Sequence, residues 1–308
     1  MMKKMICMLL AALLLAGAAA GAFAGGEVPA FRIAAPGGAP ALALAVLAAD
    51  SPENYSFVAA ETIAAEFANE TADFIIAPVN AGAKLYKAGK SDYKLAAVVS
   101  WGNLYFASQR EGFTAEDIDG AELVLFGENT INASVALYAL EKNGITPAKV
   151  EYLAGAANTQ TLLLTDETAI VLTAEPALTA AGMKNERVSG CAVNALLEKA
   201  TGENGFTQAG LFVRAKTLEE QPEAVKAYLE LAKEAASRCT EDPDAVAEAA
   251  VALEILPSVK VAKSALPNCA IRFVSAAEAR EQIEQTAEID LSQYGGAVPA
   301  DDFYYGAE

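Results

Sequence analysis

Polar side chains stand directly after short apolar runs at several points of this chain. Asn80 closely follows the run at residues 74–77, and Glu175 follows the run at residues 169–173. Such runs are typical of strands buried in a parallel sheet, and ligands bind outside the carboxyl ends of these strands. An amide at one strand end and a carboxylate at another could bind a solute by hydrogen bonds and charge. We therefore predict that Asn80 and Glu175 lie on opposite sides of a cleft.

Two loops that each precede a predicted helix carry further candidate contacts. In the first loop, Gly37, Gly38 and Ala39 let backbone N–H groups approach a ligand at a helix N-terminus, or simply form a strand-to-helix turn. In the second loop, Asn129 and Thr130 open a later helix in a similar way. Helix capping alone would also explain this second pair. Both loops are predicted to face the ligand.

The only tryptophan of the chain, Trp101, ends a predicted strand beside Gly102 and Asn103. Its ring could stack on a planar ligand, and it could equally well cap the core. Asn103 is an amide at the same strand end. Gln208 stands just before the predicted strand at residues 210–214 and completes the set of predicted ligand contacts.

The charges of these loops bear on the kind of ligand. The loops contain no lysine or arginine, but they include Glu128 and Glu175. An oxyanion usually meets arginine, or else several converging helix N-termini. We therefore predict a neutral or cationic solute, of heterocyclic type. Because helix N-termini can also bind an anion, nitrate or a sulfonate is the alternative ligand.

Composition excludes several kinds of function. The chain has no histidine, which excludes Ser-His-Asp and Cys-His catalysis and histidine-ligated zinc. Its formal charge of −18 and the lack of a basic cluster disfavour binding to nucleic acid. Cys191, Cys239 and Cys269 lack metal-type spacing, and Cys239 and Cys269 are either a disulfide or buried thiols. No catalytic residue, metal or cofactor is predicted.

The N-terminus has the features of a secretory signal peptide. Lys3 and Lys4 precede an apolar run, and the sequence Ala-Phe-Ala at residues 22–24 is a small-x-small cleavage site. We predict a signal peptide over residues 1–24, cleaved after Ala24. Ala18 stands where the lipid-accepting cysteine of a lipoprotein would be. We therefore expect a soluble exported protein, periplasmic or extracellular, without a lipid anchor.

The predicted strands and helices alternate, and their order occurs twice. Strands at residues 31–35, 55–60, 74–77 and 95–100 are followed by strands at 122–126, 150–153 and 169–173, with helices between them. The last part of the chain, from Glu219 on, reads mostly as amphipathic helices. Alternation of this kind predicts an α/β fold with parallel sheets, here as two similar lobes.

The chain resembles the substrate-binding proteins of ABC importers, in particular the nitrate/sulfonate/taurine type, whose relatives also carry pyrimidines and vitamin precursors. The resemblance rests on the signal peptide, the paired lobes and an ordered set of segments: residues 77–86 (APVNAGAKLY), 93–103 (YKLAAVVSWGN), 174–176 (AEP), 265–269 (ALPNC) and 299–305 (PADDFYY). It covers essentially the whole chain beyond the signal peptide.

This resemblance implies the type II periplasmic-binding-protein fold, in which two lobes close about a hinge on a ligand in the cleft between them. We predict that Leu104–Ser108 and residues 211–214 cross between the lobes. Lobe 1 then comprises residues 25–108 and 209–308, and lobe 2 residues 109–208. The implied partners are a small-molecule solute, an ABC permease and its ATPase, and the protein is expected to be a monomer.

Two other classes of function share this fold. One is an enzyme of the thiamine-pyrimidine or menaquinone pathway type, although the enzymes that we would compare rely on a histidine. The other is a receptor that presents its solute to a membrane sensor. The export signal favours a receptor, so we predict a binding protein rather than an enzyme.

Overall fold

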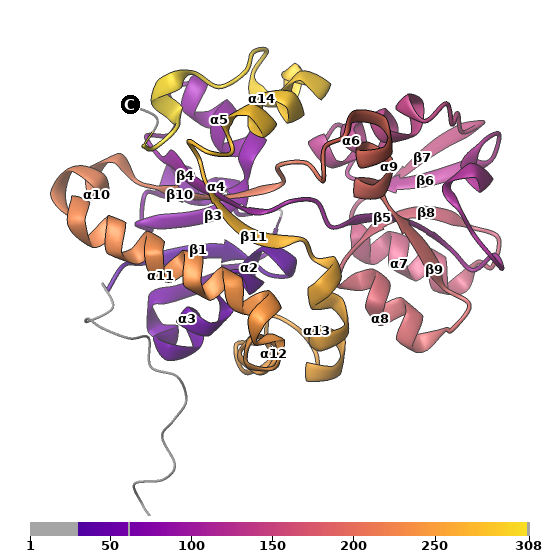
Figure 1. Cartoon of the computed structure of the whole chain (residues 1–308), viewed down its shortest axis with the longest axis horizontal. Coiled ribbons are helices and arrows are strands. Elements are labelled where there is room, and N and C mark those ends of the chain that lie inside the picture. Colours follow the sequence, from indigo (N-terminus) through magenta and orange to yellow (C-terminus); the bar gives the residue numbers. More distant parts are fainter. Residues whose placement is uncertain (1–29, 61, 307–308) are drawn as a thin grey trace, which may run out of the picture.

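The computed structural model describes residues 30–60 and 62–306 of the chain (Figure 1). The predicted signal peptide lies outside these residues. Within them the chain forms two sheets that are covered by helices on both faces, one sheet in each half of the molecule (Figure 1). This arrangement confirms the predicted two-lobed α/β fold.

The first sheet has six strands in the order β11-β4-β10-β3-β1-β2. Their bounds are β1 (Ile33–Pro36), β2 (Tyr55–Val58), β3 (Phe74–Pro78), β4 (Lys94–Ser100), β10 (Ala209–Val213) and β11 (Ile271–Ser275). β1 pairs in parallel with β2 and β3, whereas β10 runs antiparallel to β3 and β4. The first four residues of β3 are all buried, as expected for a central strand that reads as one apolar run.

The second sheet has five strands in the order β7-β6-β8-β5-β9. They are β5 (Leu104–Ser108), β6 (Glu122–Phe126), β7 (Lys149–Leu153), β8 (Ile170–Ala174) and β9 (Ser189–Ala192). This order repeats the order β2-β1-β3-β10-β4 of the first sheet, and β5 is antiparallel to its neighbours just as β10 is. The repeat predicted from the sequence is therefore present in the topology.

β5 is the strand by which the chain enters the second lobe, and β10 is the strand by which it returns to the first lobe. Leu104–Ser108 does not cross between the lobes as predicted, because it pairs with β8 and β9 inside the second sheet. Residues 211–213 likewise lie within β10 of the first sheet. The crossing segments are instead residues 101–103 and 202–208, between the last element of one lobe and the first strand of the other. We propose to place the first lobe boundary after Asn103.

Helices cover the sheets in layers (Figure 1). On one face of the first sheet lie α2 (Ala39–Leu42), α3 (Ala45–Asp50), α11 (Pro222–Glu241), α12 (Pro243–Ala252) and α13 (Val259–Ala265), with α10 (Ala215–Glu220) leading into α11. On its other face lie α4 (Ala64–Asn69), α5 (Val79–Lys87) and α14 (Arg280–Ile289). The second sheet has α6 (Ile131–Lys142) and α9 (Val193–Thr201) on one face, and α7 (Ala156–Thr165) and α8 (Ala177–Lys184) on the other.

One apolar cluster extends through both lobes on the side of α5, α14, α6 and α9. It includes Phe212 of the first sheet, Trp101 and Phe206 of the crossing segments, and Leu125 of the second sheet. The opposite faces have separate clusters. Burial of apolar surface therefore joins the two lobes on this side.

Three further features concern the remaining predictions. The C-terminal segment packs on the first lobe, since Tyr305 N donates to Leu95 O of β4 at 2.8 Å. Cys239 and Cys269 are free buried thiols. Among the described residues, no helix combines the length and the apolar character that a bilayer crossing requires.

Candidate functional site

The carboxyl ends of β3 and β8 both meet the crossing segments. Val79 N, just after β3, donates to Gln208 O at 3.1 Å, and Glu175 N, just after β8, donates to Asn103 O at 2.9 Å. Strand ends of this kind are the usual ligand-binding edge of an open α/β sheet. The carboxyl ends of β3 and β8 are thus linked through the crossing segments.

Gln208 connects the first sheet to the second lobe. Its main-chain N donates to Ser100 O at 3.0 Å, which holds it between β3 and β4. Its side-chain Oε1 accepts from Ser100 Oγ at 3.2 Å and from Asn103 N at 3.3 Å, while Nε2 donates to Asn132 Oδ1 at 3.4 Å. Asn132 lies in the first turn of α6, so Gln208 bonds to both lobes.

Asn103 and Glu175 form the next link. Asn103 is 5 % exposed, and its Nδ2 donates to Glu175 O at 2.7 Å. The carboxylate of Glu175 is buried, with 3 % of the residue exposed. Its Oε1 accepts from Asn268 Nδ2 of lobe 1 at 3.4 Å. Asn132, Gln208, Asn103, Glu175 and Asn268 therefore form one hydrogen-bonded series across both lobes, which we name the interlobe row.

Glu175 is a carboxylate without a cationic partner among the described residues. Burial raises its pKa, and hydrogen bonds from Thr179 and Asn268 lower the pKa and offset part of that effect. The bonds from Thr179 are 2.8 Å from Oγ1 to Oε1 and 3.1 Å from N to Oε2. Glu175 thus also binds the first turn of α8, and it can accept further hydrogen bonds from a ligand.

Polar atoms without a partner lie beside this row. Asn103 Oδ1, Asn80 Oδ1 and Thr173 Oγ1 are buried and have no hydrogen-bond partner among the described residues. A buried polar atom left unpaired costs about 1–3 kcal/mol. Each of these atoms can accept a hydrogen bond, so the site is suited to a ligand that carries donor groups.

From the sequence, Asn80 could also be the N-cap of the helix that follows it, but it is not. α5 begins at Val79 with Pro78 in the N-cap position, so Asn80 lies within the first turn. Proline lacks the N–H that would be left unpaired and fits before a helix. The helix end therefore does not use the side chain of Asn80, and its contact with a ligand in the cleft stays a prediction.

Among the described residues, no hydrogen bond joins the glycine loop to the interlobe row. Gly37 N donates to Val58 O at 3.0 Å, which ties the loop to β2. Gly38 has φ +98°, a conformation that favours glycine, and Ala39 is buried in α2. The described contacts of Gly37, Gly38 and Ala39 are those of a strand-to-helix turn.

The second predicted loop is also occupied mainly by its own contacts. Thr130 Oγ1 donates to Gly127 O at 2.6 Å, and Asn129 is exposed with φ +57°. The side chain that reaches the interlobe row from this region is Asn132, which the prediction missed. Asn132 lies in the first turn of α6, and nothing in the sequence there distinguishes it from a surface residue. Asn268, also missed, lies in one of the segments on which the family resemblance rests.

Trp101 packs as a core residue. It is 2 % exposed, its Nε1 donates to Arg272 O at 3.1 Å, and the Arg272 guanidinium lies 4.1 Å from the centre of the ring. This cation–π contact covers one face of the indole. The packing favours the core-capping alternative over stacking on a ligand.

Comparison with known proteins gives a family and a fold. The sequence model of a family described as NMT1/THI5 like matches residues 66–246. A solved ABC transporter structure from Parabacteroides distasonis is 18 % identical, with a TM-score of 0.77 over 90 % of this chain and 99 % of the other. The periplasmic aliphatic sulphonate binding protein SsuA from Escherichia coli is also 18 % identical, with a TM-score of 0.64 over 85 % and 86 %.

A third similar structure contains zinc. The ligand-binding component of an ABC-type import system from Staphylococcus aureus, with zinc bound, is 11 % identical, with a TM-score of 0.67 over 89 % of this chain and 95 % of the other. At such identities the likeness concerns the fold. A search of curated proteins found no match.

Proposed function

The chain belongs to the NMT1/THI5-like family, and on this premise we propose that it is a solute receptor that delivers a small molecule to an ABC permease and its ATPase. The solute would bind between the two lobes. The related folds of an ABC transporter protein, an import-system component and a sulphonate-binding protein support this proposal.

The interlobe row is the observation that carries the proposal. Asn103, Glu175 and Gln208, each predicted from the sequence as a ligand contact, are hydrogen-bonded to one another at the crossing between the lobes. A ligand bound there would touch both lobes, and it could favour one arrangement of the lobes by binding that arrangement more tightly. This coupling is what a receptor needs in order to signal its loaded state to a permease.

We propose that the ligand is neutral or cationic, and rich in hydrogen-bond donors. The buried carboxylate of Glu175 and the unpaired oxygens of Asn80 and Asn103 are acceptors. A sulfonate is the second candidate, because a structurally similar protein is named for sulphonate binding. An anion close to Glu175 would meet repulsion unless that carboxyl group were protonated.

We further propose that the protein is exported, acts as a monomer and performs no catalysis. The N-terminal signal sequence supports export, and the absence of histidine from the sequence removes the general base used by enzymes that share the fold. The similar structures are named as transport proteins, which supports a receptor rather than an enzyme.

Mass spectrometry of small molecules released from the purified native protein tests this function. We expect one species of low molecular mass in stoichiometric amount, with amine, amide or heterocyclic N–H groups. A thermal-shift panel of pyrimidines, alkylamines and alkanesulfonates then tests the ligand class. Strong stabilisation by a sulfonate alone would overturn the proposed ligand class. Release of a product of an enzymatic reaction, in place of a bound solute, would overturn the proposed receptor function.

Two variants test whether the ligand binds at the interlobe row. Asn103→Ala and Glu175→Gln should each weaken binding of the released ligand by at least about tenfold, because hydrogen bonds to a charged or buried group contribute about 1.5–3 kcal/mol. Glu198→Gln, an exposed carboxylate on α9, is the matched control and should leave the affinity unchanged. Equal affinities for all four proteins would place the ligand elsewhere.

A further inference from the structure

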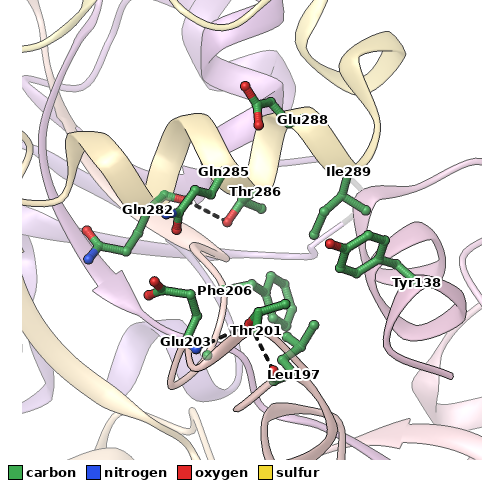
Figure 2. Close-up of a pocket in the computed structure, with 11 residues that line it drawn as sticks. Tyr138, Leu197, Thr201, Glu203, Phe206, Gln282, Gln285, Thr286, Glu288 and Ile289 are labelled. Carbon is green, nitrogen blue, oxygen red and sulfur yellow. Dashed lines mark hydrogen bonds between the residues drawn. The ribbon is translucent and has the colours of Figure 1, made fainter. Parts of the chain in front are cut away.

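A second hollow lies beside the crossing segments, on the side where one apolar cluster joins the lobes. Its volume is about 400 Å³, within the range of small-molecule sites. One wall is α14 of the first lobe, the other is formed by α6 and α9 of the second lobe, and the crossing residues Gly205 and Phe206 lie between them (Figure 2). We name this hollow the flank groove. None of the residues of the interlobe row lines it.

One end of the flank groove is polar. Figure 2 shows the carboxylate of Glu203 below the amide groups of Gln282 and Gln285, which project from α14. Glu203 is half-buried. A carboxylate and two amide oxygens supply acceptors that suit the three donors of an ammonium group.

The other end of the flank groove is apolar. Phe206, Leu197 and Ile289 line it together with the ring of Tyr138 (Figure 2). Phe206 is 2 % exposed and Leu197 is 3 % exposed, so both present a fixed surface rather than mobile chains. Small-molecule sites commonly combine such an apolar lining with a few placed polar groups.

The charge around the groove is negative. The described residues that line it include Glu203 and Glu288, and no lysine or arginine. Of the nearby cations, Lys142 lies 5.2 Å from the centre of the Tyr138 ring but does not line the groove. The Arg272 guanidinium covers Trp101 and donates to Asn204 O at 3.3 Å. A carboxylate or phosphate ligand would therefore find no cation on the lining.

We propose that the flank groove is a second binding site, for a small amphiphilic primary ammonium with an aromatic or aliphatic body. Its ammonium group binds between Glu203 and Gln282, and its apolar body lies against Phe206 and Ile289. This site is separate from the cleft and does not depend on the identity of the transported solute.

Occupancy of the flank groove links the two lobes. α14 already bonds to the crossing segment, because Thr207 N donates to Thr286 Oγ1 at 3.2 Å. Its end also bonds to α6 of the other wall, because Ser134 Oγ donates to Asp290 Oδ2 at 2.7 Å. A ligand in contact with α14 and with α9 adds a further connection. The bound ligand favours the lobe arrangement in which it contacts both walls. It therefore shifts the same equilibrium between lobe arrangements as the solute does.

The test uses three probes that share one aromatic body: 2-phenylethylammonium, 2-phenylethanol and 3-phenylpropionate. Titration of the mature protein followed by amide NMR gives both affinity and location. We expect the ammonium to bind at least tenfold more tightly than the alcohol, and the carboxylate not to bind. The amide signals of Phe206, Thr286 and Ile289 should shift, while those of Gly37 and Asn80 should not.

Variants separate a defined site from the general attraction of an acidic protein for cations. Glu203→Gln should weaken ammonium binding about tenfold, whereas Glu198→Gln, an exposed carboxylate on α9 outside the groove, should leave it unchanged. Thr201→Phe, at an exposed position that lines the groove, should fill it and abolish binding.

Several results would overturn the flank groove as an ammonium site. These are equal effects of Glu203→Gln and Glu198→Gln, equal affinity for the ammonium and the carboxylate, or shifts confined to the cleft. Because the released solute is measured separately, loss of this proposal leaves the proposed receptor function intact, and the reverse also holds.

Discussion

Glu175 is the residue at which the competing demands of folding and binding are clearest. A buried carboxylate without a cationic partner is costly, and the desolvation that raises its pKa is the expression of that cost. The hydrogen bonds that Glu175 accepts from Thr179 and Asn268 offset only part of the free energy lost when the carboxylate is removed from water. A position that needed only to cap α8 could use serine or threonine, so the carboxylate points to a role in binding.

The raised pKa of Glu175 predicts a specific pH dependence of stability. The folded state holds this proton to higher pH than the unfolded state, so the contribution is complete below the unfolded pKa and is lost as pH rises through the folded pKa. Glu175→Gln should therefore gain stability relative to wild type as pH rises above the unfolded pKa of glutamate, about 4.3, and the gain should level off above the folded pKa of Glu175. Urea unfolding of both ligand-free proteins at several pH values measures this. A difference between Glu175→Gln and wild type that stays constant across these pH values would refute the prediction.

The sequence indicated some residues of the interlobe row and missed others for one physical reason. Asn103, Glu175 and Gln208 flank strands, and the ends of strands in an α/β sheet are recognisable from apolar runs alone. Asn132 and Asn268 lie within a helix and a helical turn, where nothing local distinguishes a cleft residue from a surface residue. Their role arises only from the packing of distant segments, by contacts that a single sequence does not record.

The crossing segments are the elements on which lobe movement depends. Asn194 Nδ2 of α9 donates to Trp101 O and to Gly102 O, both at 2.9 Å, and so fixes the first crossing to the second lobe. Gly205 of the second crossing packs against Trp101 O so closely that an added Cβ would overlap it. Two glycines thus allow the two crossings to lie in contact.

Gly102→Ala should destabilise the protein by about 2–4 kcal/mol. Gly102 has φ +90°, which strains any other residue, and a Cβ there would lie 2.5 Å from Asn194 Oδ1 and 2.6 Å from the Phe206 ring. Gly112→Ala is the matched control, because Gly112 has φ +66° and open space around it, so it should cost only about 1–2 kcal/mol. Urea unfolding compares them, and equal losses would mean that backbone strain alone accounts for the effect.

The same segments show where reading elements from the sequence fails. The run Leu104–Ser108 was correctly predicted as extended and apolar, but an apolar run does not reveal which sheet it joins. β9 and β11 were missed altogether; β9 is half-exposed, and Arg272 and Ser275 interrupt the apolar pattern of β11. β3 and β6 were found almost to the residue because both are continuous apolar runs followed by loop signals.

For the whole molecule, two of the hydrogen bonds that join the lobes lie at separate places. Ser134 and Asp290 connect α6 to the end of α14, and Asn268 connects the first lobe to Glu175 before α8. Both bonds are partly exposed to solvent, so each is worth about 1 kcal/mol. Hinged proteins commonly differ by only a few kcal/mol between open and closed forms. Two such bonds are therefore enough to shift that balance.

The double variant Ser134→Ala with Asn268→Ala should open the ligand-free protein. Removal of about 2 kcal/mol of interlobe bonding raises the population of open molecules roughly thirtyfold, if neither bond survives opening. Small-angle X-ray scattering should show a larger radius of gyration than that of wild type, and saturating solute should reduce the difference. Ser237→Ala is the control, because Ser237 Oγ donates only to Glu234 O in its own helix. Identical scattering from the double variant and wild type would show that the shared apolar cluster, rather than these bonds, sets the angle between the lobes.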